Sequence, residues 1–313
     1  MPSVEPIVDA YGRPFLNFRI SVTQKCNLHC PYCHREGQPQ SKDEMTPAEI
    51  AGIAGIAGEL GARRVKLTGG EPLIRRDIAE IVGLLGKEKT IDEISMVTNG
   101  TLLTFPLAEN LKRNGLVRVN INIPSVNAET YENLTRGRLR DALEGVKAAK
   151  SAGLSPVKVN MLLLKGVNDD QIDSMTKFCR ETGATLQLIE LEPLNVESKY
   201  YSQYHCSLDD IERELSSKAR KVEVRRSMQG RKVYHLGDAR IEVVKPVENT
   251  EFCLHCSRMR LTSDGKLKPC LMRCDDLVDV LSPIRSGTSD QEVRRLLESS
   301  ARSRRPFYGG GSF

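Results

Sequence analysis

The chain has 313 residues, which excludes a mini-protein and allows one large domain, or a large domain with an appendage. Hydrophobic residues make up 39% and charged residues 28%, which excludes wholesale disorder and a fibrous protein. The net charge of +5 is too mild to require a nucleic-acid partner, but it suits an anionic small molecule.

No apolar run is long enough to span a bilayer, because the longest uncharged stretch, residues 94–108, carries polar residues and proline. The first ten residues lack the basic start and apolar run of a signal peptide. We therefore expect a cytoplasmic protein with no membrane partner. Aromatic residues are few and tryptophan is absent, so single-stranded nucleic acid is not expected either.

Short apolar or β-branched runs predict six strands, at residues 15–22, 64–67, 94–98, 117–123, 157–164 and 184–191. Helix-like segments lie between them, at residues 46–60, 76–86, 105–114, 139–152 and 169–182. Because strand and helix alternate, the sheet should be parallel. Six such units predict an α/β fold in the form of an incomplete barrel, with reactive residues at the carboxyl ends of the strands.

The regular alternation stops after Glu192, so we expect a partial barrel over residues 1–192 and a C-terminal extension over 193–313. Residues 221–244 of the extension are typical of short alternating strands. The basic residues around them are interpreted as a solvated face; they are Lys218, Arg220, Lys221, Arg225 and Arg226. Residues 302–313 are expected to be a flexible, basic and glycine-rich tail.

Nine cysteines in a chain without a secretion signal indicate metal binding or catalysis rather than a disulfide framework. Six of them form two groups, C-x3-C-x2-C and C-x2-C-x13-C; their members are Cys26, Cys30 and Cys33, and Cys253, Cys256 and Cys270. Each group has one thiolate fewer than a closed zinc site needs. Three thiolates on an iron–sulfur cubane leave one iron open to a reactant. Zinc stays the alternative, with a fourth ligand from His29 or His34 in the first group and from His255 or Cys274 in the second.

Three further motifs carry chemistry. Arg258 and Arg260 lie between the second group's cysteines, where two guanidinium groups would bind a phosphorylated substrate. The Gly-Gly-Glu segment at residues 69–71 permits close backbone approach to a ligand, although a plain turn has the same composition. Lys158 begins an apolar strand, and it is either a ligand or a strand-end lysine with its head in water.

With Tyr32 as its aromatic residue, the first cysteine group resembles the C-x3-C-x-aromatic-C motif of the radical S-adenosylmethionine (SAM) superfamily. Within that superfamily the chain resembles the GTP 3′,8-cyclase family of molybdenum cofactor biosynthesis. The segments that carry this resemblance are RISVTQKCNLHCPYC, KLTGGEPLIRRD, VTNG, KVNMLLLKGVND, IELEPL and FCLHCSRMRLTSDGKLKPCL. The resemblance covers nearly the whole chain and implies a six-unit incomplete barrel. It also implies two [4Fe-4S] clusters, with SAM on the first and GTP on the second.

The resemblance assigns roles to individual residues. The six cysteines of the two groups would hold the clusters. Residues expected to bind SAM are Tyr32, Gly69, Gly70, Glu71 and Asn122. Residues expected to bind GTP are Arg19, Lys66, Lys158, Arg258 and Arg260, of which Arg258 and Arg260 are the expected catalytic pair.

The chain departs from the family pattern at four positions. Lys66 stands where the family usually has arginine, Val97 replaces a threonine, Asn122 a serine and Glu192 a methionine. Val97 cannot hydrogen-bond through its side chain, whereas the adjacent Thr98 can. The family tail enters the active site, and here residues 309–313 would have to accommodate a phenylalanine.

The implied reaction begins with abstraction of the 3′ hydrogen of GTP by a 5′-deoxyadenosyl radical, and the carbon radical then attacks C8 of guanine. The product would be (8S)-3′,8-cyclo-7,8-dihydroguanosine 5′-triphosphate, and the enzyme a lyase. Expected partners are an external electron donor, a downstream cyclic pyranopterin monophosphate synthase and a second copy in a homodimer.

Two alternatives remain open. One is a radical SAM enzyme that matures a peptide or a haem precursor and carries an auxiliary cluster. The other is a non-catalytic protein with two zinc or iron–sulfur sites.

Overall fold

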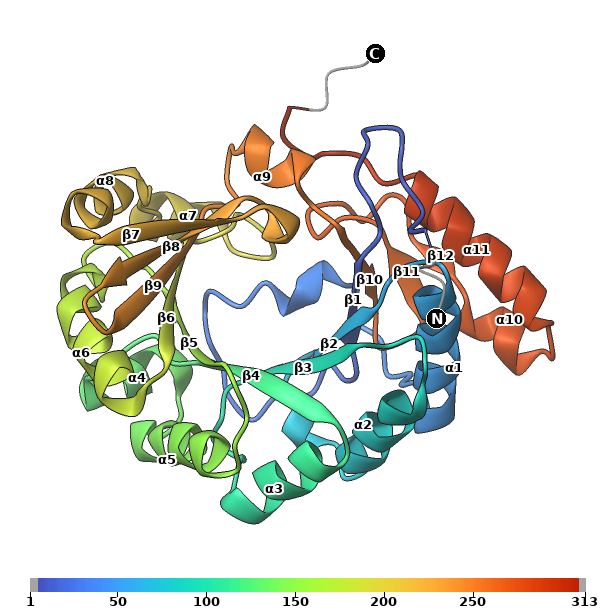
Figure 1. The fold of residues 1–313 in the computed structure, drawn as a ribbon, viewed down its shortest axis with the longest axis horizontal. Helices are drawn as coiled ribbons and strands as arrows, with labels where there is room; N and C mark the ends of the chain where they lie inside the picture. The colour runs from blue at the N-terminus through green and yellow to red at the C-terminus, as the bar shows by residue number, and fades with distance from the viewer. Residues whose placement is uncertain (1–4, 310–313) are drawn as a thin grey trace.

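The computed structural model describes residues 5–309, which contain one curved sheet of twelve strands (Figure 1). The strands are β1 (Asn17–Ser21), β2 (Arg64–Thr68), β3 (Glu93–Thr98), β4 (Leu116–Asn122), β5 (Val157–Leu162), β6 (Thr185–Ile189), β7 (Lys221–Arg225), β8 (Arg231–Leu236), β9 (Ala239–Val244), β10 (Arg258–Leu261), β11 (Lys266–Lys268) and β12 (Val278–Asp279). Their order is β12-β11-β10-β1-β2-β3-β4-β5-β6-β9-β8-β7. The eight central strands, from β10 through β1 to β6 and on to β9, pair in parallel. At the two ends of the sheet, β11 and β12 and also β8 and β7 are added by antiparallel pairing.

Helices follow most of the central strands and lie on the outer face of the curve (Figure 1). They are α1 (Pro47–Glu59), α2 (Ile78–Lys87), α3 (Phe105–Arg113), α4 (Ala128–Thr135), α5 (Leu139–Ser151), α6 (Ile172–Thr182), α7 (Ser198–Tyr204), α8 (Asp209–Lys218), α9 (Thr250–Leu254), α10 (Leu281–Arg285) and α11 (Asp290–Arg302). Short 3₁₀ helices are η1 (Arg35–Gly37), η2 (Pro72–Ile74), η3 (Asp169–Gln171) and η4 (Arg226–Met228). The helix α1 begins with a capping box, in which Thr46 and Glu49 exchange hydrogen bonds.

The two faces of the sheet differ in chemistry because successive side chains of a strand point to opposite faces. In β1, Phe18 and Ile20 are fully buried in the hydrophobic core beneath the helices. Arg19 lies between them and therefore points to the inner face. The same alternation in neighbouring strands gives an apolar layer outside and a polar interior inside the curve.

The predicted incomplete barrel is confirmed, with the six predicted strands present as β1 to β6. The residues after 192 contribute two more parallel strands, because β9 pairs with β6 and β10 pairs with β1. The alternating strands predicted at residues 221–244 are also confirmed, as β7, β8 and β9. The predicted extension is thus continuous with both edges of the barrel sheet, which local sequence periodicity does not reveal.

The expectation of a flexible tail from residue 302 is wrong for the residues that the structure describes. Helix α11 extends to Arg302, and Arg304 is 2% exposed. The Arg304 guanidinium group donates to the backbone oxygens of Ala301 and Pro14 at 3.0 and 3.3 Å, and it ion-pairs with Asp9 at 3.3 Å. The Pro14 oxygen and the Asp9 carboxylate become available only when the N-terminal segment is folded beside Arg304. Residues 310–313 lie outside the described part.

Within residues 5–309, no helix combines the length and the apolar character needed to cross a membrane.

Candidate active site

The first cysteine group lies in the loop that follows β1. The backbone N–H of Leu28 donates to Cys26 Sγ at 3.4 Å, and Tyr32 is hydrogen-bonded to Cys30. Burial raises the pKa of the Cys30 thiol to about 12, and the charges of Cys33 and Cys26 add to the increase. The three sulfur atoms are therefore close enough to interact electrostatically. Three thiols on one loop are the donor set of an iron–sulfur cluster, in which each thiolate binds a different iron.

The Gly-Gly-Glu segment at the end of β2 packs directly on this cysteine loop. The N–H groups of Gly70 and Glu71 donate to the carbonyl oxygens of Thr23 and Lys25 at 2.7 and 2.8 Å. A Cβ atom on Gly70 would lie 2.1 Å from the Lys25 oxygen, and Gly69 has a φ of +148° that side chains rarely adopt. Glycine is needed at both positions because the two backbones approach so closely.

Glu71 is fully buried, and its carboxylate organises a third loop. It accepts hydrogen bonds from Thr98 Oγ1 and the Asn99 N–H, both at 2.6 Å, and from the Leu73 N–H at 3.0 Å. Asn99 Nδ2 in turn lies 4.0 Å from Cys26 Sγ. The acid therefore joins the segment after β2 to the segment after β3 beside the cysteine loop. The Thr98 hydroxyl, a candidate substitute for the missing threonine at Val97, donates to Glu71.

The other residues expected to bind SAM lie at the same end of the sheet. Asn122 ends β4, is exposed, and accepts a hydrogen bond from Asn160 Nδ2 at 2.8 Å. Tyr32 packs against a small apolar cluster that includes Leu134, Leu164 and Leu191. Glu192 follows β6, and its charge contributes to the raised pKa of Tyr308. The carboxyl ends of the parallel strands thus surround the first cysteine group.

The second cysteine group is assembled from α9, the loop after it and the loop after β11. Burial raises the pKa of the Cys270 thiol, and the charges of Cys256 and Cys253 contribute to that shift. Burial would also raise the pKa of Cys256, but the Arg258 and Arg260 guanidinium charges outweigh it and lower that pKa. The Cys256 N–H donates to the Cys253 carbonyl oxygen at 3.2 Å, so a turn after α9 brings these two cysteines together, and with Cys270 they would supply three thiolates to a cluster.

Cys274, the candidate fourth ligand, has different neighbours. Its thiol donates to the Gly37 carbonyl oxygen at 3.1 Å and lies 3.1 Å from Lys268 Nζ. These contacts join it to the segment after the first cysteine group. In residues 5–309, no set of three His, Cys, Asp or Glu side chains has the arrangement needed to hold a single metal ion.

A group of cations fills the interior between the cysteine groups. In register across the sheet, Arg260 lies beside Arg19, and Arg19 beside Lys66. Burial lowers the pKa of Lys66 well below its ordinary value, and nearby positive charges lower it further; they are those of Arg118, Arg19, Arg258 and Lys158. The five residues expected to bind GTP are thus brought together from β1, β2, β5 and β10.

Sequence reasoning missed two of the interior cations. Arg118 is inward-facing on β4, where it alternates with the buried Val119, and this alternation was the signal available in the sequence. Arg231 begins β8, and it contributes to the lowered pKa of Arg258. Arg225, interpreted above as solvated, instead lies 3.4 Å from the buried Glu242 carboxylate. Its location depends on the pairing of β7, β8 and β9.

Three carboxylates partly neutralise these cations. Glu36 lies 2.6 Å from Arg19 and 3.8 Å from Arg260, and Glu93 lies 2.6 Å from Arg118. Glu242 pairs with Lys158 and lies 2.9 Å from Arg231. Although burial opposes ionisation, these cations hold the pKa of Glu36 and of Glu242 at about 2. The named cations still outnumber the carboxylates, so the interior attracts a polyanion.

The chain is similar to known proteins over nearly its whole length. Residues 20–179 match the radical SAM superfamily, and residues 184–309 match the family described as Molybdenum Cofactor Synthesis C. A probable GTP 3′,8-cyclase of Methanothermobacter marburgensis is 46% identical over 307 residues, which cover 96% of this chain and 98% of the relative. A probable GTP 3′,8-cyclase of Pyrococcus horikoshii is 44% identical over 312 residues, which cover 98% and 99%.

Among solved structures, Streptococcus suis SuiB bound to its precursor peptide SuiA matches with a TM-score of 0.65 at 16% identity, covering 91% of this chain and 68% of SuiB. At this identity the likeness shows the fold alone. The match to the radical SAM model implies a [4Fe-4S] cluster and SAM as cofactors. By its full-length relatives and its two matched family models, the chain belongs to the radical SAM superfamily and, within it, to the family of the probable GTP 3′,8-cyclases.

Proposed function

We propose that this chain is a GTP 3′,8-cyclase, a lyase that converts GTP to (8S)-3′,8-cyclo-7,8-dihydroguanosine 5′-triphosphate in molybdenum cofactor biosynthesis. The observation that carries the proposal is the group of buried cations that joins the two cysteine groups. A triphosphate would supply the negative charge needed to balance the excess of cations over carboxylates.

In this proposal Arg19, Lys66, Lys158, Arg258 and Arg260 bind the triphosphate. Arg258 and Arg260 are the catalytic pair, since they lie on the strand that directly follows Cys256 and would hold the nucleotide beside the second cysteine group. Fixing the triphosphate fixes the position of the ribose, and a misplacement of about 1 Å can cost about 100-fold in rate. Arg118 and Arg231 would strengthen the same field.

The residues around the first cysteine group support the cofactor assignment. Cys26, Cys30 and Cys33 would hold a [4Fe-4S] cluster, which together with SAM supplies a 5′-deoxyadenosyl radical. Tyr32, Gly69, Gly70 and Asn122 lie around the cysteine loop, where they would contact SAM. Glu71 accepts three protein hydrogen bonds that position the loops of this site, and its remaining acceptor capacity would serve the expected contact with SAM.

A second [4Fe-4S] cluster on Cys253, Cys256 and Cys270 would leave one iron open to the guanine base. An external reductant, the downstream cyclic pyranopterin monophosphate synthase, a homodimer and a cytoplasmic location belong to the same proposal. The proposal divides the chain into a barrel at 1–192, which would hold the first cluster, and an extension at 193–313, which would hold the second cluster.

The test is to incubate the anaerobically reconstituted protein with GTP, SAM and dithionite. Mass spectrometry should detect 5′-deoxyadenosine in step with an isomer of GTP that has a C3′–C8 bond. Arg258→Met should reduce nucleotide conversion strongly while iron content is kept. Arg240→Met, which changes an exposed arginine on β9, is the matched control. Cleavage of SAM with GTP unchanged would contradict the substrate assignment.

A further inference from the structure

The segment directly after the first cysteine group contacts the second cysteine segment at three successive residues. The Glu36 carboxylate faces Arg260, the Gly37 carbonyl oxygen accepts from Cys274 Sγ at 3.1 Å, and Gln38 contacts the backbone of residue 263. We call residues 36–38 the brace. They lie three to five positions after Cys33, so they connect the two cysteine groups by a short path.

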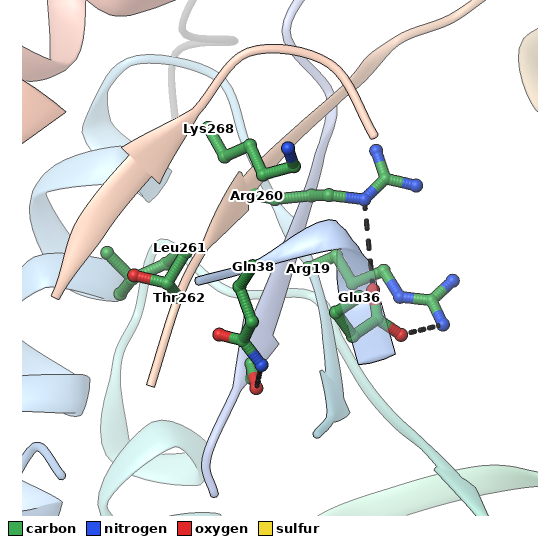
Figure 2. A pocket seen from close by; sticks show the side chains of 8 residues that line it. Arg19, Glu36, Gln38, Arg260, Leu261, Thr262 and Lys268 are labelled. Carbon is green, nitrogen blue, oxygen red and sulfur yellow. Dashed lines mark hydrogen bonds and ion pairs between the residues drawn. The ribbon is translucent and has the colours of Figure 1, made fainter. Parts of the chain in front are cut away.

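Glu36 is the charged member of the brace (Figure 2). Arg19 Nη2 and Thr68 Oγ1 donate to its Oε1 at 2.6 and 2.8 Å, and Arg260 Nε lies 3.8 Å from its Oε2. Arg19 and Arg260 are direct neighbours in the parallel register of β1 and β10. Two adjacent guanidinium groups repel one another, so the carboxylate between them sets where both can lie.

The other two brace residues pack without spare room. A Cβ atom on Gly37 would lie 2.7 Å from the carbonyl oxygen of Leu271, the residue after Cys270, and Gly37 has a φ of +58°. Gln38 accepts from the Ser263 N–H at 3.1 Å and donates to Ser21 Oγ at 2.8 Å. The cavity that Glu36 and Gln38 help to line is only about 10 Å³, room for about one water molecule.

We propose that residues 36–38 are a positioning element that fixes the second cysteine segment and its arginine Arg260 relative to the first cysteine loop. The inference rests on the proposed function, since its consequence is coupling between the two sites. If the brace is loosened, SAM can still be cleaved at the first site, but the ribose is no longer held at the distance at which a radical reacts with it. The radical would then take its hydrogen atom from a C–H or X–H bond of the protein or the buffer, and the variant enzyme would form 5′-deoxyadenosine without the cyclised nucleotide.

The first experiment measures the amount of cyclised nucleotide formed per 5′-deoxyadenosine in the reconstituted protein. Glu36→Gln keeps the size of the side chain and removes its charge, and it should lower this ratio about tenfold. Asp92→Asn is the matched control, because it also removes a carboxylate that pairs with an arginine, Arg63 at 2.8 Å, but lies outside the brace and outside the group of interior cations. The control should stay within about twofold of the wild type. An unchanged ratio in Glu36→Gln at full iron content would overturn the inference.

The second experiment does not depend on turnover. Gln38→Leu removes the acceptor of the Ser263 N–H, so hydrogen–deuterium exchange at that amide should become about tenfold faster. Gly37→Ala should also speed exchange around residue 271, whereas Gly12→Ala should not. Gly12 has a comparable φ of +74° with open space around it, and so it controls for backbone strain alone.

Unchanged exchange in both brace variants would refute the positioning role. If the wild type cleaves SAM but leaves GTP unchanged, the proposed function fails, and the exchange result alone then decides the brace.

Discussion

The Lys158 ammonium group and the Glu242 carboxylate form a buried ion pair across the inner face of the sheet, with side chains that are 5% and 0% exposed. They come from β5 and β9, strands that lie on either side of β6. Burial lowers the pKa of Lys158 to about 8, although Glu242 opposes that shift. The pKa of Lys158, an expected triphosphate ligand, therefore lies close to neutral pH.

This pKa predicts the pH dependence of GTP use. Below about pH 8 Lys158 is charged and attracts the triphosphate, and above it the charge is lost. We expect kcat/KM for GTP to fall as pH rises through about 8, because kcat/KM reports ionisations of the free enzyme. Lys158→Arg should remove this fall, since arginine stays charged throughout. Steady-state kinetics between pH 7 and 9.5 measures both; an identical fall in Lys158→Arg would assign the ionisation to another group.

Gly70→Ala should disrupt the first cysteine loop. The new Cβ atom would lie 2.1 Å from the Lys25 carbonyl oxygen, so the loop must move. We expect iron content after reconstitution to fall from about eight to about four per chain, since two cubanes become one. Gly52→Ala is the control, because nothing lies within 4 Å of its new Cβ atom. Full iron content in Gly70→Ala would show that the loop tolerates the displacement.

Cys274→Ser should leave both clusters in place. Its thiol contacts Gly37 and Lys268, whereas the neighbours that shift the pKa of Cys270 include Cys256 and Cys253. Iron and sulfide analysis should therefore give wild-type values for Cys274→Ser and a loss of about four irons for Cys270→Ser. Equal losses in the two variants would make Cys274 a ligand.

Arg304→Met should destabilise the fold. The substitution removes a buried guanidinium group that donates to backbone oxygens of Ala301, Pro14 and Arg13 and pairs with Asp9. We expect the free energy of unfolding to fall by about 3 kcal/mol, the usual scale for breaking a buried pair. Arg302→Met, at an exposed position, should change it by less than about 0.5 kcal/mol. Thermal or urea unfolding of the reconstituted protein compares the two variants.

Local sequence patterns were sufficient to predict the parallel sheet and the two groups of cysteines. The alternation of Phe18 and Ile20 with Arg19 predicts a strand with one apolar face, and the six such runs separated by helical segments predict the parallel sheet. The spacing of the cysteines indicates two groups of three, of which the first lies within one loop and the second is divided between α9, the loop after it and the loop after β11. Arg258 and Arg260 could be singled out because they stand next to Cys256 in the chain.

Contacts between segments far apart in the chain could not be predicted from local sequence patterns. Arg118, Arg231 and Glu242 become part of the interior through strand register, which depends on how β4, β8 and β9 pair across the sheet. Arg304 is buried only because the N-terminal segment supplies backbone acceptors some 290 residues away in the chain. The sequence thus specifies the elements and the two cysteine groups, whose signals are local. Folding decides which charges share the buried interior, because that depends on packing among strands far apart in the chain.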